Sequence, residues 1–216
     1  MKISYQILCK NEDESLKELL DLLLEYKQEQ DEINVCRDST GTNPATLEIV
    51  KEYEGKINYY EREIKHTIHE QKNWLAGKAT GDFLMYLDAD ELLEPLFLKN
   101  LPSMVEHNKE VDIYFFPRIN TVEGLTEEYK ASRNWRTNQH GWINYPDWQD
   151  RLFRHKVGIK YHEIPHGRLT SKGRKYAMLP HVATTVYAIK HHKTFEKQVS
   201  DNTWHDNKER ELGLRD

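Results

Sequence analysis

Two carboxylates one residue apart, Asp88 and Asp90, are the residues of this sequence best suited to chemistry. They follow an apolar run at 83–87 that has the length of a buried strand. Carboxylates at the end of a strand can hold Mg²⁺ or Mn²⁺, and such an ion also binds the oxygens of a phosphate. Asp-x-Asp alone occurs in many solvated turns, but the strand before it favours a metal site.

Polar side chains also follow two other predicted strands. Asn11 comes after the run at 3–9, and Asp38 comes after the run at 33–36. These strands alternate with helices through short connections, which indicates a parallel sheet with helices on both faces. Ligands of such sheets bind beyond the carboxyl ends of the strands, so we expect Asn11, Asp38 and the Asp88–Asp90 pair to meet in one cleft.

The alternation of strand and helix extends to about residue 119 and then stops. Asn11 is expected to cap the helix after the first strand, with Glu14 at the capping-box spacing. We interpret residues 120–216 as an elaboration of the same domain that ends in a polar helix. The expected strands are 3–9, 33–36, 56–60, 83–87 and 111–119, and the helices after the first are 44–53, 67–79 and 94–107.

Composition excludes several classes of protein. The chain has 216 residues, of which 31% are charged, 38% hydrophobic and 11% aromatic, and this suits one folded domain rather than a disordered chain. No apolar run approaches the roughly 20 residues of a membrane helix, and residues 1–5 start no signal peptide. Cys9 and Cys36 lie in strand-like runs, so we expect buried, reduced thiols and a cytoplasmic protein.

Charge is distributed unevenly along the chain. Residues 1–117 contain 13 Lys and Arg against 24 Asp and Glu, a net charge of −11, whereas residues 118–216 contain 18 against 12, a net charge of +6. A basic second half indicates either contact with anionic groups or a solvated surface.

Aromatic residues are concentrated in one irregular stretch of the second half. Trp135, Trp142, Tyr145 and Trp148 lie there together with His140. Aromatic faces stack on sugar rings or nucleobases. The same residues could equally fill the core beneath a flap.

The residues His162-Glu163-Ile164-Pro165-His166 match the H-E-x-x-H pattern of zinc peptidases. That pattern requires a continuous helix, which Pro165 interrupts, and the preceding segment 158–161 has the composition of a strand. We therefore reject the peptidase interpretation. A P-loop is excluded as well, because 77–80 lacks the upstream glycine and lies at a helix end.

Several segments, in this order, resemble the family 2 glycosyltransferases, which have the GT-A fold. The most specific likeness is in Gln71-Lys72-Asn73, Ala79-Thr80-Gly81-Asp82-Phe83 and Leu87-Asp88-Ala89-Asp90-Glu91. The opening 7–12 resembles the family's first strand, and 38–42 resembles its Asp-Ser-Gly-Ser-Thr turn. A small bacterial branch related to lipopolysaccharide-core glucosyltransferases is resembled by Pro117-Arg118-Ile119-Asn120, Tyr145-Pro146-Asp147-Trp148-Gln149, Arg151-Leu152-Phe153-Arg154 and His162-Glu163.

The resemblance implies a single GT-A-like, Rossmann-like α/β domain with a mostly parallel central sheet. Residues 1–119 would be its nucleotide-sugar-binding half, and residues 120–216 its acceptor-side half. Asp38 would accept a hydrogen bond from the nucleotide base, usually uracil, although Arg37 stands where much of the family has a second Asp.

The nucleotide pocket and metal site are also implied by the resemblance. Asn11 and Asn73 would line the pocket, Asp88 would hold the ribose and help to position the metal, and Asp90 would ligate it. Two of these residues also have structural interpretations, because Asn11 could be only a helix cap and Asn73 only a partner of buried backbone groups.

For the acceptor side, the resemblance implies a general base and further anion-binding groups. Glu163 would take the proton of the acceptor hydroxyl in a single displacement with inversion, and Asp147 is the rival base. His181 would reach the metal or the diphosphate. Arg151 and Arg154, interpreted as sharing one strand face, would contact diphosphate or acceptor, or would lie on an exposed face.

We therefore expect a metal-dependent transferase that uses a nucleotide sugar, with UDP-sugar as the favoured donor and Mn or Mg as cofactor. Two acceptors remain open, namely a bacterial surface glycan and a hydroxymethylated DNA base, since a basic surface suits backbone phosphates. One alternative is a nucleotidyltransferase, which usually has a Gly-rich loop where this chain has 10–13. Another is a non-catalytic module that binds a nucleotide sugar or nucleic acid.

Overall fold

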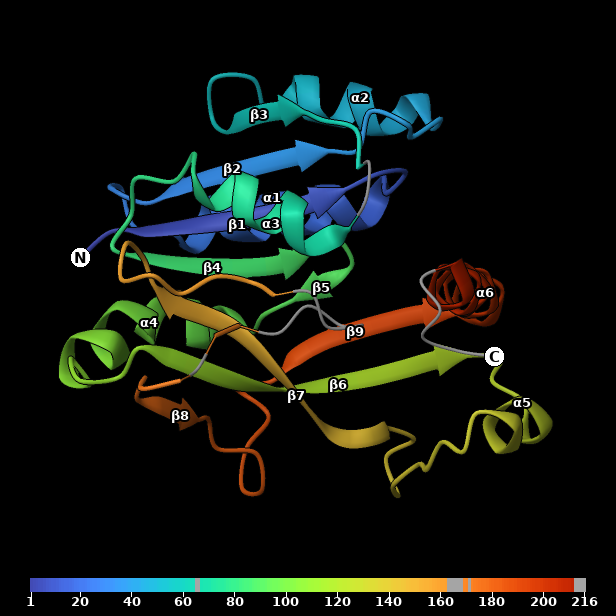
Figure 1. Ribbon diagram of the computed structural model, residues 1–216. Coiled ribbons are helices and arrows are strands. Elements are labelled where there is room, and N and C mark those ends of the chain that lie inside the picture. The colour runs from blue at the N-terminus through green and yellow to red at the C-terminus, as the bar shows by residue number, and fades with distance from the viewer. Residues whose placement is uncertain (65–66, 163–168, 171, 212–216) are drawn as a thin grey trace.

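The computed structural model describes residues 1–64, 67–162, 169–170 and 172–211, with the side chains of 208, 209 and 211 left out. The described residues form one sheet whose strand order is β3-β2-β1-β4-β7-β6-β9-β5, with β8 paired to β6 (Figure 1). The strands are β1 (Ile3–Cys9), β2 (Glu32–Arg37), β3 (Asn58–Glu61), β4 (Phe83–Asp88), β5 (Glu91–Leu92), β6 (Ile113–Glu123), β7 (Ile143–Arg154), β8 (Tyr176–Met178) and β9 (Ile189–Thr194).

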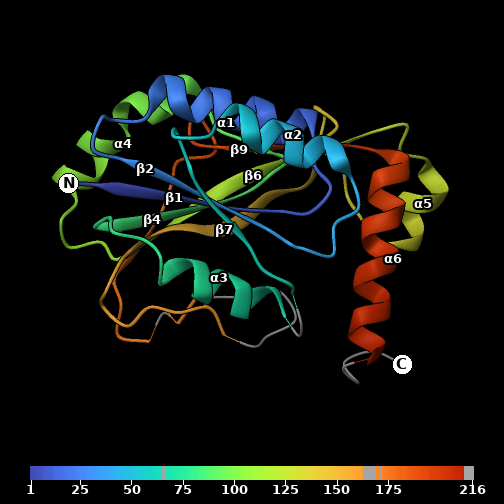
Figure 2. The ribbon, with the colours of Figure 1, turned by 90° about the horizontal axis from the view of Figure 1, so that it is seen from above.

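Helices cover both faces of this sheet, as the alternation predicted. Figure 2 shows α1, α2 and α4 on one face and α3 on the other. The helices are α1 (Glu14–Tyr26), α2 (Pro44–Glu52), α3 (Ile68–Ala76), α4 (Pro95–His107), α5 (Glu127–Ser132) and α6 (Phe195–Glu211). The prediction of an α/β domain with a mostly parallel sheet is confirmed, because five of its eight strand pairings are parallel.

Helix α1 shows how the sequence pattern builds the layers. Its leucines at 16, 19, 20 and 23 follow helical spacing and are fully buried. The predicted cap is wrong by two residues, because the helix begins after Asp13, whose carboxylate accepts the Glu14 N–H. Asn11 does not cap the helix because its side-chain oxygen accepts from the backbone of the loop after β2 instead.

The second half joins the same sheet through β7, which lies between β4 and β6 and is antiparallel to both. The predicted strand at 158–161 is wrong, since only Tyr161 pairs there, in a single bridge to Leu169. Two features prevent a longer ladder. Gly158 turns the chain with a φ of 81°, and the Asn73 side chain binds both backbone groups of Tyr161.

The strands and helices enclose a main core and a smaller one. The smaller core lies toward α3 and contains Tyr86 and Phe153, whose rings stack with centroids 6.0 Å apart. Helix α6 packs against β6 and β9 at the end of the sheet where the β1, β2 and β4 strands finish (Figures 1 and 2). Within the described residues, no helix is long and apolar enough to cross a bilayer.

Candidate active site

The carboxyl ends of β1, β2 and β4 lie side by side, as the sequence predicted. Leu8 of β1 is level with Cys36 of β2 on one side and with Asp88 of β4 on the other. Asp38 and Asp88 therefore leave neighbouring strands at the same edge of the sheet. Helix α6 closes this edge, because Lys197 lies 3.5 Å from Glu12 in the loop after β1 and 3.6 Å from Asp90 after β4.

Asp38 is a buried carboxylate with one oxygen committed to the protein. Its Oδ1 accepts the backbone N–H groups of Thr40 (3.1 Å) and Ile64 (3.3 Å), and its Oδ2 lies 3.3 Å from Lys10 Nζ. Burial acts to raise the pKa of Asp38, but these hydrogen bonds outweigh it and lower the pKa. Asp38 is therefore ionised at neutral pH, and its side chain can only accept hydrogen bonds.

Asn11 ties two strand-end loops together. Its Oδ1 accepts the N–H groups of Thr42 (2.7 Å) and Asn43 (3.0 Å). Asn43 in turn donates from Nδ2 to the Asn11 carbonyl (2.9 Å). Asn11 thus lies at the expected edge of the sheet and shapes the loop that contains Asp38, while its contact with a nucleotide stays a prediction.

Asp88 lies against a buried pair of charges. Arg151 Nη2 is 2.6 Å from Asp88 Oδ2 and 2.5 Å from Glu91 Oε1, and the Asp88 N–H donates to Glu91 Oε2 (3.1 Å). Burial acts to raise the pKa of Asp88, but the charges of Arg151, Lys72 and Arg118 outweigh it and hold the pKa well below its usual range. Arg151 therefore fixes Asp88 in its ionised form.

The pairing of Arg151 corrects one prediction about strand β7. Arg151 and Arg154 do not share a face, since they are three positions apart on an extended strand, where faces alternate with every residue. Arg151 is 4% exposed and faces Asp88, whereas Arg154 binds Asp112 and lies over the Phe83 ring. Arg151 is thus not on an exposed face, and its contact with a donor diphosphate stays a prediction.

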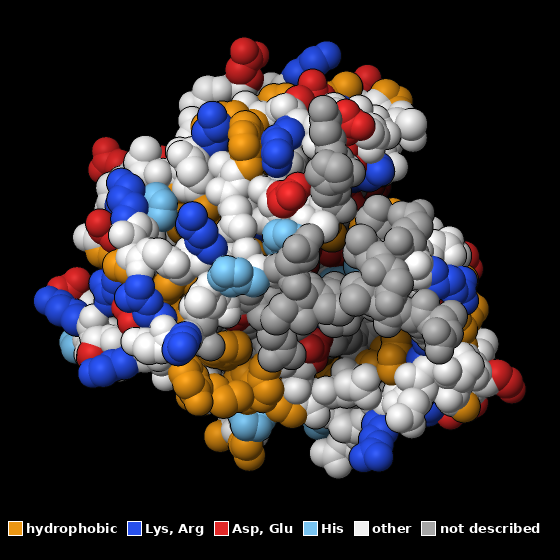
Figure 3. All heavy atoms as spheres, in the orientation of Figure 1, with side chains coloured by type: hydrophobic (Ala, Val, Ile, Leu, Met, Phe, Trp, Pro, Cys, Tyr) orange, Lys and Arg blue, Asp and Glu red, His pale blue; other side chains and the backbone are white. Residues whose placement is uncertain are grey.

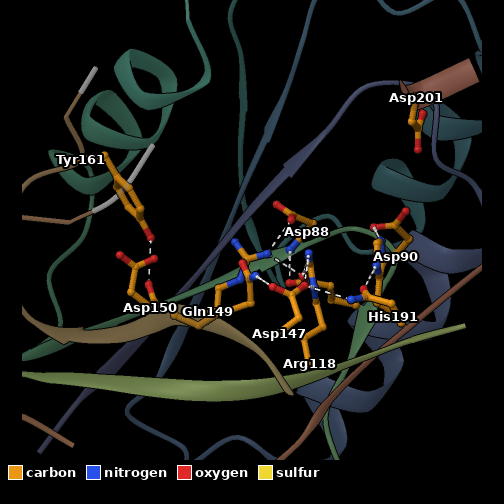
Figure 4. A network of polar contacts seen from close by, with 12 residues as sticks. Asp88, Asp90, Arg118, Asp147, Gln149, Asp150, Tyr161, His191 and Asp201 are labelled. Atoms are coloured by element: carbon orange, nitrogen blue, oxygen red, sulfur yellow. Dashed lines mark hydrogen bonds and ion pairs between the residues drawn. The ribbon is translucent and has the colours of Figure 1, made fainter. Parts of the chain in front are cut away.

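Further polar contacts connect Asp88 and its partners, step by step, to Asp90 (Figure 4). Arg118 donates from Nη1 to Glu91 (2.9 Å) and from Nε and Nη2 to Asp147 Oδ2 (2.9 and 2.7 Å). Asn120 Nδ2 donates to the same Asp147 oxygen (2.9 Å), and its Oδ1 lies 2.8 Å from His191 Nδ1. His191 Nε2 is 3.6 Å from Asp90 Oδ1, so the contacts run from Asp88 round to Asp90.

We call this set the charge network. Its members, in order of contact, are Asp88, Arg151, Glu91, Arg118, Asp147, Asn120, His191 and Asp90.

Asp90 is surrounded by basic groups. Besides His191, Lys193 Nζ and Lys197 Nζ lie 3.7 and 3.6 Å from its Oδ2. Burial acts to raise the pKa of Asp90, but the hydrogen bond and charge of His191 and the charge of Lys193 lower it to about 2. When a metal ion binds Asp90, the three basic groups can release this carboxylate and pair with the phosphates bound to the ion. Neither the carboxylate nor the basic groups are then left without a partner.

The donor set at Asp90 fits a divalent ion. Asp147 can only accept hydrogen bonds, so the Asn120 group facing it is the NH₂, and the Asn120 oxygen faces His191. His191 Nδ1 must then carry hydrogen, so Nε2, which lies beside Asp90, is the ring nitrogen that would bind a metal ion in place of a proton. Among the described residues no three His, Cys, Asp or Glu side chains gather as a metal site. Mg²⁺ and Mn²⁺ fit this arrangement because substrate phosphates and water complete their coordination.

His181, the histidine predicted to reach the metal, lies among aromatic residues. Its backbone oxygen accepts the Tyr145 hydroxyl (2.9 Å), and its ring lies 5.0 Å from Trp148. The structure thus places His191 rather than His181 against Asp90. Metal ligation by His181 stays a prediction that no described contact supports.

Asn73 anchors the segment that leads to the predicted base. Its Oδ1 accepts the Tyr161 N–H (2.9 Å), and its Nδ2 donates to the Tyr161 carbonyl (2.8 Å). Glu163 and the rest of 163–168 lie outside the described residues. Beyond them, Leu169 N–H donates to Asp150 Oδ2 (2.8 Å), so the described residues on either side of 163–168 are attached to α3 through Asn73 and to the sheet through Asp150.

Six residues of this site were missed by sequence reasoning: Glu91, Arg118, Asn120, His191, Lys193 and Lys197. Features of the sequence could have identified three of them. Glu91 directly follows the Asp-x-Asp pair, and Arg118 and Asn120 alternate on one face of β6.

The strand order and the carboxylates at the strand ends define a glycosyltransferase of the GT-A fold. A family model described as glycosyl transferase family 2 matches residues 4–174. This match covers most of the chain, and the chain therefore belongs to glycosyl transferase family 2. A search of curated proteins found no match.

Solved structures with the same fold include two complexes with nucleotide sugars. TarS 1–349 from S. aureus in complex with UDP-GlcNAc matches with a TM-score of 0.54 and 17% identity over 84% of this chain and 59% of that one. The mannosyltransferase PcManGT from Pyrobaculum calidifontis, in complex with GDP-Man and Mn²⁺, matches with a TM-score of 0.56 and 16% identity over 88% of this chain and 56% of that one. The chain thus spans under two thirds of the length of each.

Proposed function

We propose that this chain transfers a sugar from a UDP-sugar to a saccharide hydroxyl, with Mn or Mg and with inversion at the anomeric carbon. The observation that carries the proposal is the arrangement of Asp90, His191, Lys193 and Lys197 beside Asp88 at the carboxyl edge of the sheet. Family membership supports glycosyl transfer, and the bound UDP-GlcNAc and GDP-Man of the similar structures support a nucleotide-sugar donor.

Asp38 supports a donor whose base carries an N–H on its pairing edge. As an ionised carboxylate with Oδ1 already occupied, it has Oδ2 left to accept such a hydrogen bond. Uracil and guanine offer a ring N–H at this edge, whereas adenine and cytosine offer an acceptor nitrogen there. We choose uracil because the family resemblance implies it.

Asp90 and His191 would hold the metal, and Lys193 and Lys197 would contact the diphosphate. When bound, the ion supplies charge neutralisation for the leaving nucleoside diphosphate. Lys193 and Lys197 add positive charge at the same place, and both are positioned by the chain itself, one on β9 and one on α6. Asp88, which Arg151 holds in place, would bind the ribose hydroxyls.

We assign the general base to Glu163 rather than to Asp147. Asp147 accepts three hydrogen bonds on Oδ2 from Arg118 and Asn120 and one on Oδ1 from Gln149. Burial acts to raise the pKa of Asp147, but these partners outweigh it and lower the pKa. A carboxylate with few free lone pairs and a lowered pKa is a weak base, so we give Asp147 a positioning role.

We place this activity in the cytoplasm. Cys9 and Cys36 are buried free thiols, which suit a reducing compartment.

A panel of nucleotide sugars tests the proposal. The protein and a mixture of neutral oligosaccharides, which supply the acceptor hydroxyl, are incubated with UDP-, GDP-, ADP- and CDP-sugars in Mn²⁺, in Mg²⁺ or in EDTA, and release of nucleoside diphosphate is measured. We expect turnover of at least one UDP-sugar that EDTA abolishes and Mn²⁺ restores. Asp90→Ala should lower this turnover by about 100-fold or more, and should weaken Mn²⁺ binding in the presence of UDP, measured by EPR.

Asp21→Ala, which removes an exposed carboxylate of α1, is the matched control. Turnover that is unchanged in EDTA or in Asp90→Ala would rule out the metal mechanism, and turnover of none of the sugars would rule out the donor.

A further inference from the structure

A groove with aromatic walls lies beside the charge network, outside the strand-end site. Its volume is about 670 Å³, within the range of roughly 300–1,000 Å³ typical of small-molecule sites. We call it the aromatic groove, and its lining residues contribute rings, amides and hydroxyls: among them are Gln139, His140, Trp142, Tyr145, His181 and Thr185.

The rings of the groove hold one another in place. Trp142 packs against His140 and Tyr145, with centroids 4.8 Å apart in each pair. Tyr145 donates its hydroxyl to the backbone oxygen of His181. The loop is fixed as well, because Asn138 Oδ1 accepts the N–H groups of His140 and Trp142 (3.0 Å each). The Trp142 ring is therefore presented in a preformed position and remains partly exposed.

The chemistry of the lining selects for an uncharged ligand with apolar faces and polar edges. Among the described lining residues there is no Lys, Arg, Asp or Glu. A second hollow of about 380 Å³ shares Trp142 and Tyr145 and adds one charged residue, Arg136. Sugar rings match this surface, since their C–H faces pack on aromatic rings and their hydroxyls pair with amides and hydroxyls. A nucleic acid would require several basic groups for its phosphates, which the groove does not provide.

The position of the groove connects it to the reaction site. Tyr145 lies on β7 two residues before Asp147 of the charge network, and Trp148, next to Asp147, contacts His181. The groove also opens beside the hydrophobic side chains that Figure 3 shows over β8 and the loop after it. Val182 of that loop lines the groove and is 88% exposed.

We propose that the aromatic groove binds neutral sugar rings of the acceptor, with Trp142 as the stacking platform. This assignment rests on the proposed sugar transfer, and it selects a glycan over a modified DNA base as the acceptor. The acceptor chain would run from the groove along β7 toward Asp147, so that its terminal hydroxyl reaches the donor site.

Direct binding tests the proposal. Probes are neutral oligosaccharides of glucose, mannose, galactose and N-acetylglucosamine, together with single-stranded and duplex DNA. Binding is followed by tryptophan fluorescence and calorimetry. We expect at least one oligosaccharide to bind, and Trp142→Ala to weaken it by about tenfold or more, the loss expected for a stacking ring.

Two variants make the result specific. Trp142→Phe keeps an aromatic face and should retain most of the affinity, which separates stacking from misfolding. Trp204→Ala removes a half-exposed tryptophan of α6 outside the groove and should leave oligosaccharide binding unchanged. If no oligosaccharide binds, if Trp142→Ala binds as the wild type does, or if only DNA binds, the assignment is wrong.

Turnover separates this proposal from the proposed function. A wild-type protein that turns over a UDP-sugar but binds no oligosaccharide refutes the groove alone. Oligosaccharide binding through Trp142, without turnover of any nucleotide sugar, supports the groove and refutes the transferase.

Discussion

Replacing one carboxylate oxygen of Asp38 by an NH₂ group tests whether this residue binds the base of the donor. In Asp38→Asn, the side-chain oxygen can still accept the N–H groups of Thr40 and Ile64, while an NH₂ replaces Oδ2, the oxygen that lies beside Lys10. We expect UDP to bind about 10- to 100-fold more weakly, because a charge-assisted hydrogen bond worth about 1.5–3 kcal/mol becomes a clash of two donors.

Calorimetry with UDP and CDP measures this change. CDP should lose no affinity in Asp38→Asn, since cytosine presents an acceptor nitrogen to the new NH₂. Equal losses for both nucleotides would mean that the loop had been disturbed, and an unchanged UDP affinity would show that Asp38 does not contact the base.

At the residue scale, the sequence predicted the carboxylates at strand ends but not their partners. Asp38, Asp88 and Asp90 could be placed because a parallel sheet brings its carboxyl ends together. Glu91 and Arg118 could not, since a buried ion pair depends on which distant strands become neighbours. His191 was missed for the same reason, because it lies 101 positions after Asp90 along the chain.

At the scale of elements, Asn73 of α3 should act by holding Tyr161, two residues before Glu163. In Asn73→Ala we expect kcat to fall by about 10- to 100-fold, because a small displacement of a catalytic group is costly. UDP affinity should stay unchanged, since both the oxygen and the NH₂ of the Asn73 side chain are hydrogen-bonded to Tyr161. Glu163→Gln should lower kcat by ~10²–10⁴-fold, also at the chemical step.

Steady-state kinetics and UDP calorimetry together check this role. Asn100→Ala on the exposed surface of α4 is the matched control. A loss of UDP affinity in Asn73→Ala, with kcat preserved, would instead place this amide at the nucleotide.

The first half of the fold was predictable, and the second was not. Strand β4 is an apolar run from Phe83 to Leu87, and β1 is mostly apolar and buried, because both faces of a parallel sheet are covered. Strand β7 lacks this pattern, since between Ile143 and Arg151 it consists mainly of polar and aromatic residues that serve the charge network and the groove. Its antiparallel insertion between β4 and β6 depends on contacts far apart in sequence.

At the scale of the whole molecule, Glu32 of β2 makes the stability of the fold depend on pH. Its carboxylate accepts from Lys2 Nζ (2.8 Å), the Ser4 hydroxyl (2.6 Å) and both the N–H and the hydroxyl of Thr80 (2.7 and 2.6 Å). Burial acts to raise the pKa of Glu32, but these bonds lower it from 4.5 to about 2. The native state therefore binds this proton less readily than the unfolded state, and the stabilisation is lost as the pH falls from 4.5 toward 2.

Glu32→Gln should reduce the free energy of unfolding by about 1.5–3 kcal/mol at pH 7, where the wild type gains most from the charge. The difference should shrink steadily below the ordinary pKa of glutamate. Urea unfolding of both proteins between pH 3 and 7 measures it. A difference that does not change with pH would show that the charge of Glu32 contributes nothing.

The charge network has a consequence for how this protein can change over generations. Charged members of the network neutralise their neighbours, so replacing Glu91 alone leaves the buried Arg151 with only one of its two counter-charges, Asp88. Two replacements that remove both members of a pair together cost less than their separate effects suggest. Substitutions at Glu91, Arg118 and Asp147 are therefore expected to be inherited in combinations, and the order in which they arise will decide which descendants still fold.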